Sequence, residues 1–176
     1  MHKQNLHERY LCAARTKRLS LDAQRSTAAD VLLAAGMASQ HDEKSRVALR
    51  FARLKSGDVA EFSALKDVAG TWLYVRSKRA GRARLKSASA GELASKVLFY
   101  WMNDTCRVCH GRGHPTMLNA PTLDTSRDCP ACHATGREPV SRIVQPEYVD
   151  EARWLIDQLD VISHGVFHRM QKLLAK

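Results

Sequence analysis

The chain has 176 residues, of which 44% are hydrophobic and 26% are charged, and its formal net charge is +10. No apolar run approaches the roughly 18 residues of a membrane helix, and the first residues lack the apolar stretch of a secretory signal, so we expect a cytoplasmic protein without membrane partners. Frequent alanine, leucine, arginine and lysine favour a mainly α fold, and the positive charge favours a polyanionic partner such as nucleic acid.

Residues 1–25 form a predicted basic N-terminal arm. It holds two acidic residues, Glu8 and Asp22, against six cations, namely Lys3, Arg9, Arg15, Lys17, Arg18 and Arg25. The pattern fits a mobile arm as well as a short helix, and it fits a solvated tail as well as a contact to phosphate or to an acidic partner.

A helical region is predicted over residues 26–104, and three of its helices lie before residue 80. The first extends from Ser26 to a stop at Gly36, and the second from Asp42 to Ser56-Gly57. Asp58 caps the third, in which apolar residues recur at intervals of three and four as far as Val75.

A dense run of cations follows the third helix. Six lie within eleven residues, namely Arg76, Lys78, Arg79, Arg82, Arg84 and Lys86. Cations at this density are costly unless water or anions surround them, so the run is either a solvated loop or a contact to phosphate. After it, residues 87–91 are predicted to be a small polar linker, and residues 93–101 an amphipathic helix that leads to Cys106.

Four of the five cysteines form two pairs, and they identify residues 105–138 as a zinc-binding module. The pairs are Cys106-x-x-Cys109 and Cys129-x-x-Cys132, with nineteen residues between them. Two tight turns that each present two thiolates are typical of a four-cysteine zinc site. Glycines after each pair permit the sharp turns, whereas Ala134 stands where the first half has Gly111, so we expect a less regular second turn.

Other interpretations of the cysteine pairs are less favoured. Each pair continues as C-x-x-C-H, the attachment pattern of c-type haem, but that chemistry normally follows export. A disulfide framework would leave Cys12 unpaired, and a redox C-x-x-C would need a βαβ context. Three histidines are possible alternative ligands, although solvation or phosphate contact is favoured for them: His110, His114 and His133. No HExxH motif or carboxylate-rich set indicates a catalytic zinc, so an enzyme is not predicted.

Residues 110–128 contain two prolines and are predicted to form a loop or short hairpin. Arginines stand around the cysteine pairs and predict a rim that meets phosphate: Arg107, Arg112, Arg127 and Arg137.

Residues 139–176 are predicted to form a C-terminal helical hairpin. Gln145-Pro146 opens its first helix, residues 160–163 form the turn, and Ser163 caps the second helix. The pattern fits a helix-turn-helix that reads DNA and, equally, an ordinary hairpin that completes the core. Four side chains would decorate the exposed face of the second helix: His164, His168, Arg169 and Lys172.

These motifs, in this order, resemble one family. An Asp-Val-x-x-Ala-x-Gly-Met-Ala segment at 30–38, a Cys-x-x-Cys-His-Gly-x-Gly knuckle, a second Cys-x-x-Cys and a Leu-Ile-x-x-Leu helix are similar to the late-gene antitermination protein Q of lambdoid phages. The similarity covers residues 26–174. The knuckle by itself also resembles the cysteine-rich repeats of DnaJ-type chaperones, without their His-Pro-Asp motif.

The resemblance to protein Q implies a DNA-binding transcription factor that loads onto paused host RNA polymerase and lets it ignore terminators. Cys106, Cys109, Cys129 and Cys132 match the zinc ligands of the family, and segment 147–174 matches its helix-turn-helix-like region. The runner-up hypothesis is a DnaJ-like zinc-binding adaptor for RNA or protein. The two differ in salt dependence, because phosphate-dominated binding weakens steeply as salt rises.

Overall fold

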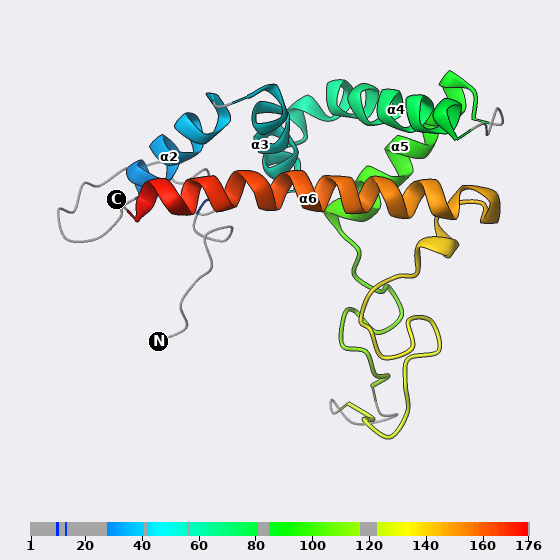
Figure 1. The fold of residues 1–176 in the computed structure, drawn as a ribbon. Helices are drawn as coiled ribbons and strands as arrows, with labels where there is room; N and C mark the ends of the chain where they lie inside the picture. The colour runs from blue at the N-terminus through cyan, green and yellow to red at the C-terminus, as the bar shows by residue number, and fades with distance from the viewer. Residues whose placement is uncertain are drawn as a thin grey trace. The chain divides into compact units, whose positions relative to one another are not determined.

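The computed structural model describes residues 10, 13, 28–40, 42–55, 57–80, 85–116 and 123–175. These residues contain no β-strand, only two isolated β-bridges, so the predicted mainly α fold is confirmed. None of the described helices is both long enough and apolar enough to cross a membrane. The elements, coloured along the chain in Figure 1, are α2 (Ala28–Gln40), α3 (Glu43–Lys55), η1 (Val59–Glu61), α4 (Phe62–Arg79), α5 (Ser87–Met102), η2 (Val140–Arg142), η3 (Pro146–Tyr148) and α6 (Val149–Leu174).

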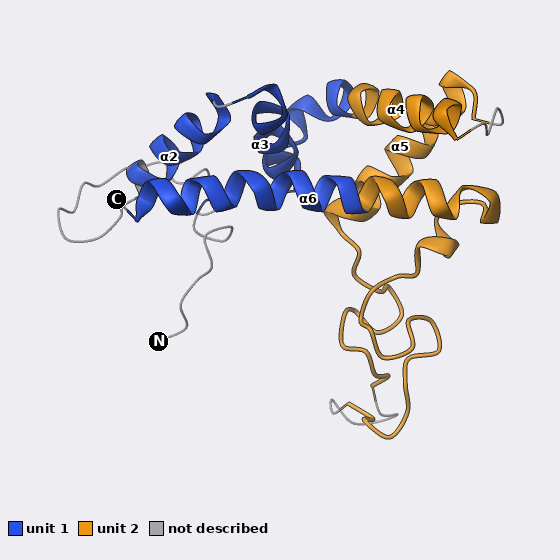
Figure 2. Cartoon of the chain, viewed as in Figure 1, with its two compact units in different colours: residues 1–65, 157–176 blue, residues 66–156 orange. Residues whose placement is uncertain are grey.

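The chain divides into two compact units (Figure 2). Unit 1 comprises residues 1–65 and 157–176, and unit 2 comprises residues 66–156. Both boundaries fall inside helices, in α4 and in α6, so the units differ from the predicted division at residues 104 and 138. The predicted zinc module lies wholly in unit 2, whereas the predicted N-terminal arm lies outside the described residues except for Tyr10 and Ala13.

One buried cluster of unit 1 is rich in alanine. Alanines of α2 and α3 pack with Val166 and Met170 of α6, and the ring of Tyr10 meets that of Phe167 edge to face, with centroids 5.9 Å apart. Alanine lets helix backbones approach closely while it retains full helix propensity. Helix α2 therefore continues through Gly36 to Gln40, because Ala38 is buried beyond it; the predicted stop at Gly36 is wrong.

The ends of α3 follow the sequence closely. Asp42 accepts a hydrogen bond of 2.6 Å from the Ser45 N–H and so caps the first turn. At the other end Gly57 adopts φ +95°, and the N–H of Asp58 bonds the carbonyl of Arg53, which is a Schellman ending. Asp58 then caps η1, which continues directly into α4. The predicted boundaries at Asp42, Gly57 and Asp58 are confirmed.

In unit 2, α4 and α5 approach each other through two glycines. A Cβ added at Gly70 would lie 3.3 Å from the Cα of Gly91, so the two backbones are nearly in contact at this point. Residues 87–91, predicted as a linker, are instead the first turns of α5. Their small side chains suit a close helix crossing, and this packing outweighs the weak helix propensity of serine and glycine.

The C-terminal region is one continuous helix, α6, and not the predicted hairpin. Buried residues recur along it with a spacing of three and four through the predicted turn at 160–163: Ala152, Leu155, Leu159, Ser163, Val166 and Met170. A turn would shift the phase of this stripe and expose its second half, and residues 160–163 contain neither glycine nor proline to induce one. The segment therefore supplies no helix-turn-helix.

Ser163 distinguishes the continuous helix from the predicted hairpin. Its side chain is buried, and its hydroxyl has no hydrogen-bond partner among the described residues. We expect Ser163→Ala to raise the free energy of unfolding by about 1 kcal/mol, because alanine is the better helix former and no buried hydroxyl is left unsatisfied. Urea denaturation followed by circular dichroism measures the change.

Ser45→Ala is the matched control for this experiment. The Ser45 hydroxyl is also buried, but it accepts a hydrogen bond from the Arg169 guanidinium, so its loss should lower stability by about 2 kcal/mol. If Ser163→Ala instead lowered stability by about 1 kcal/mol, Ser163 would be acting as a helix cap and the hairpin would be correct.

Candidate metal centre

The four paired cysteines converge on one point in unit 2. Their Sγ atoms all lie within 4.8 Å of one another, and each residue is at most 3% exposed. The closest pairs join the two half-sites: Cys106 and Cys129 at 4.0 Å, Cys109 and Cys132 at 3.6 Å. A tetrahedral ion with Zn–S bonds of about 2.3 Å holds its sulfur atoms about 3.8 Å apart, so the four thiols fit a single zinc ion.

Two antiparallel contacts bring the half-sites together. The N–H of Cys106 donates to the carbonyl of Gly136 at 2.8 Å, and the N–H of Cys129 donates to the carbonyl of Gly113 at 2.8 Å. The arrangement is reciprocal. In each half, a glycine after the second cysteine accepts the N–H of the first cysteine of the opposite half. An isolated bridge between Thr105 and Arg137 extends the first contact, so entry to and exit from the module lie side by side.

The two turns have the same backbone conformation. His110, Gly111 and Gly113 have φ angles of 51°, 82° and 78° in the first turn; in the second, His133, Ala134 and Gly136 have 50°, 66° and 70°. The expectation of a less regular second turn at Ala134 is therefore wrong. Alanine is tolerated at positive φ there because the surrounding contacts fix the backbone, at a cost of about 1 to 2 kcal/mol.

Glycine is required at two of these positions for lack of space. A Cβ at Gly113 would lie 2.5 Å from the carbonyl oxygen of Ala134, and a Cβ at Gly136 would lie 2.4 Å from that of Gly111. The two contacts are equivalent, and they press each turn against the other. At Gly111 itself the nearest atom to an added Cβ is a side-chain methyl of Thr105, at 3.2 Å.

The surroundings of the sulfurs promote a thiolate. Burial would raise the pKa of Cys109, but the N–H of Gly113, 3.3 Å from its Sγ, and the three neighbouring thiols lower it to about 7. Burial raises the pKa of Cys132 to about 11, and its hydrogen bond with Cys109 acts in the same direction. The cluster therefore supplies a thiolate near neutral pH, which is the form that binds zinc.

The alternatives to a four-cysteine zinc site fit this geometry poorly. The four thiols are free, at separations well beyond the ~2.05 Å of a disulfide. Two haems would require the two pairs to lie apart, each with its own macrocycle. His110 and His133 are exposed, and within the described residues the metal-compatible group consists of the four cysteines. His114 faces the carbonyl of Arg127, with Nδ1 3.0 Å from the oxygen.

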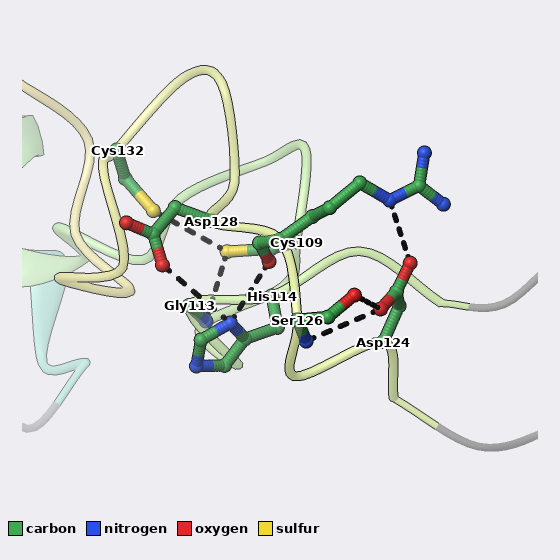
Figure 3. A network of polar contacts seen from close by, with 8 residues as sticks. Cys109, Gly113, His114, Asp124, Ser126, Asp128 and Cys132 are labelled. Atoms are coloured by element: carbon green, nitrogen blue, oxygen red, sulfur yellow. Dashed lines mark hydrogen bonds and ion pairs between the residues drawn. The ribbon is translucent and has the colours of Figure 1, made fainter.

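A buried carboxylate, which the sequence analysis did not single out, organises the loop before Cys129. Asp124 accepts hydrogen bonds from the N–H and hydroxyl of Ser126 and from Nε of Arg127 at 2.6 Å (Figure 3). The Ser126 and Arg127 hydrogen bonds hold the pKa of Asp124 below its usual value. Figure 3 also shows the thiols of Cys109 and Cys132 pointing toward one another. The Asp-x-Ser pattern of an Asx turn was a sequence signal for this role.

The predicted arginine rim is largely paired within unit 2. Nε of Arg107 lies 3.5 Å from Glu138, and Nε of Arg137 lies 3.4 Å from Asp104. Arg127 is the partner of Asp124 described above, and Arg112 donates to the hydroxyl of Thr116 at 3.1 Å. All four arginines remain exposed, so these interactions are weak surface pairs. Tyr100, another unpredicted contact, donates its hydroxyl to the carbonyl of Glu138 at 2.9 Å.

The other predicted nucleic-acid contacts are distributed over both units. In unit 2, Arg76, Lys78 and Arg79 occupy the last turn of α4 and Lys86 directly precedes α5, whereas Arg82 and Arg84 lie outside the described residues.

In unit 1, the predicted exposed face of the last helix is only partly correct. His164, His168 and Lys172 are exposed on α6. Arg169 is half-buried and donates to the hydroxyl of Ser45, so its prediction as an exposed contact is wrong. Its guanidinium packs against α3 because α6 continues straight past that helix.

Comparison of the chain with protein-family models, curated proteins and solved structures finds no match.

The close contacts of the two turns generate a prediction. Gly136→Ala places a methyl group against the Gly111 carbonyl, so we expect the variant to lose zinc or to bind it at least tenfold more weakly, as measured by competition with a chromophoric chelator. Gly111→Ala is the matched control, since it reproduces the alanine that the second turn already has, and it should retain nearly full affinity. Equal losses in both variants would contradict the packing argument.

Proposed function

We propose that this chain is a zinc-dependent, DNA-binding antitermination factor of the phage type, which acts on host RNA polymerase so that transcription continues through terminators. The convergence of the four cysteines on one tetrahedral site is the observation that carries the proposal, because it supports the most specific motif in the resemblance to protein Q. The net charge of +10 supports a polyanionic partner.

The arrangement supports a structural role for the metal. Four thiolates fill the coordination shell of zinc, whereas a catalytic zinc keeps a position open for water. The chain's own residues hold the site: the Gly113 N–H bonds the Cys109 sulfur, and the crossed glycine carbonyls fix both turns. These features favour a regulator over an enzyme.

The continuous helix α6 changes what supports DNA binding. Without a turn at 160–163, the segment that resembles the helix-turn-helix region of the family does not supply that motif. The DNA-binding part of the proposal therefore rests on charge, and the family assignment rests on the metal module and on the order of motifs.

Loss of one ligand tests the role of zinc. We expect Cys129→Ser to lose bound zinc and to unfold the module, because structural zinc contributes on the order of 10 kcal/mol in small modules. Zinc content by atomic emission and protease cleavage between residues 105 and 138 would report both changes. Cys12→Ser, which alters the cysteine outside the pairs, is the control and should retain one zinc ion per chain. Full zinc content in Cys129→Ser would refute the four-cysteine site.

Transcription across a terminator tests the function itself. With purified bacterial RNA polymerase and a template from the DNA that flanks this gene, we expect the zinc-loaded protein to raise read-through several-fold and Cys129→Ser to have no effect. Duplex DNA binding by the wild-type protein should also weaken steeply with salt. Binding to duplex DNA without any gain in read-through would leave a DNA-binding protein but reject antitermination.

The second candidate is a zinc-stabilised adaptor that binds RNA or protein. One observation favours it: Val108, inside the first cysteine pair, is 57% exposed and offers an apolar contact at the surface of the module. An adaptor for unfolded protein would retain its binding at moderate salt, so flat salt dependence together with no affinity for duplex DNA would favour this candidate.

A further inference from the structure

Two segments of the chain account for its net positive charge. Residues 1–25 carry six cations and two acidic residues, and residues 76–86 carry six cations and no acidic residue. These two segments account for the whole net charge of +10, since the other residues contain sixteen of each sign. Most of unit 1 and the metal module therefore contribute almost nothing to the net charge.

Metal binding makes the module less positive still. Residues 105–138 contain four arginines against three acidic residues, a net charge of +1 before metal is counted. Four thiolates and one divalent zinc ion together carry −2, so the loaded module has a net charge of −1. A surface with this balance attracts phosphate weakly, and Arg107, Arg127 and Arg137 would have to leave the acidic partners already described.

The last turn of α4 and the start of α5 differ from the metal module, because their cations have no acidic partners among the described residues. Arg79, Lys86 and Lys78 are exposed and have no ion-pair partner among the described residues; Nζ of Lys78 lies over the ring of Tyr74, 4.9 Å from its centroid. Cations without acidic partners exchange small counterions for phosphate with the full gain in entropy. These three residues are therefore better placed to bind phosphate than Arg107, Arg127 and Arg137, which have acidic partners.

The structure also holds this end in place. The guanidinium of Arg76 lies over the Trp154 ring, 4.7 Å from its centroid, and fixes the last turn of α4 within unit 2. Leu85 is buried directly before Lys86, and the close approach of Gly70 to Gly91 joins the two helices. These contacts hold the backbone that carries Lys78, Arg79 and Lys86.

We infer that Lys78, Arg79 and Lys86, at the end of the α4–α5 pair, bind the phosphodiester backbone of DNA and that the zinc module is not part of this contact. The inference rests on the proposed function in two respects, namely that the chain binds DNA and that the four thiolates hold zinc. Arg76 positions the last turn of α4 through its stacking on Trp154.

Two triple variants with the same change in net charge test the inference. One is Lys78→Gln/Arg79→Gln/Lys86→Gln, and the control on the module rim is Arg107→Gln/Arg112→Gln/Arg137→Gln. Each removes three positive charges, so a non-specific effect of net charge would be equal in both. Arg127 is left in place because its bond to Asp124 supports the loop before Cys129.

Affinity for a short fluorescein-labelled DNA duplex is measured by anisotropy between about 0.05 and 0.2 M salt. For the α4–α5 variant we expect a loss on the order of 100-fold at about 0.1 M salt and a fall of about 2.7 in the slope of log K against log salt, because each neutralised phosphate contributes about 0.9 to that slope. For the rim variant we expect less than about a threefold loss. Zinc content and circular dichroism show that each protein is folded.

If the α4–α5 triple variant does not fold, Arg79→Gln and Lys86→Gln singly should each lower the slope by about 0.9. Equal losses in the two triple variants, or a larger loss in the rim variant, would overturn the inference while leaving DNA binding intact. A wild-type protein without affinity for duplex DNA would overturn both the proposed function and the inference. DNA binding without terminator read-through rejects only antitermination.

Discussion

The crossed hydrogen bonds between the two cysteine turns are the constraint on which the metal centre depends. A glycine carbonyl of each turn accepts the N–H of the first cysteine in the other, which sets the four sulfurs face to face. Among the described residues of the module, the buried cluster around them consists of the four cysteines and Ala131, which is little apolar surface with which to fold a module. In the proposed zinc-bound module, the metal would supply the stability that a hydrophobic core supplies elsewhere, and the glycines fix the geometry of the turns.

The sequence predicted the ligands because a cysteine knuckle is a local structure. Two residues between the cysteines and glycines soon after them favour the tight turn that each pair forms. Ala134 was misjudged because its cost at positive φ is local, whereas the force that holds it there is the pairing with the first turn. Tyr100 was missed for a related reason, because its partner, the carbonyl of Glu138, becomes a neighbour only when the module closes. Asp124 differs, since its partners Ser126 and Arg127 are close in sequence and its Asx turn could have been recognised.

The helices show the same division between local and distant causes. Asp42, Gly57 and Asp58 were recognisable because caps and helix ends use hydrogen bonds to adjacent residues. The predictions at Gly36, at residues 87–91 and at 160–163 were wrong for one reason. Each placed a helix break where local helix propensity is weak, although buried residues continue through the segment. The periodic stripe that contains Leu155, Leu159 and Val166 was present in the sequence, and it outweighed the capping preference of a single serine.

Under the proposed function, metal and charge have separate roles, because the metal centre and the cationic segments differ in the sign of their net charge. A zinc tetrathiolate is negative, so loading zinc lowers the net charge of the module. When zinc is removed, the thiolates take up protons and the net charge of the module rises. Electrostatics by itself would then make the apoprotein the better ligand for a polyanion. If DNA binding requires zinc, the electrostatic effect of zinc cannot be the reason. Zinc would then act through structure, by keeping the module ordered beside the helices that carry the cations.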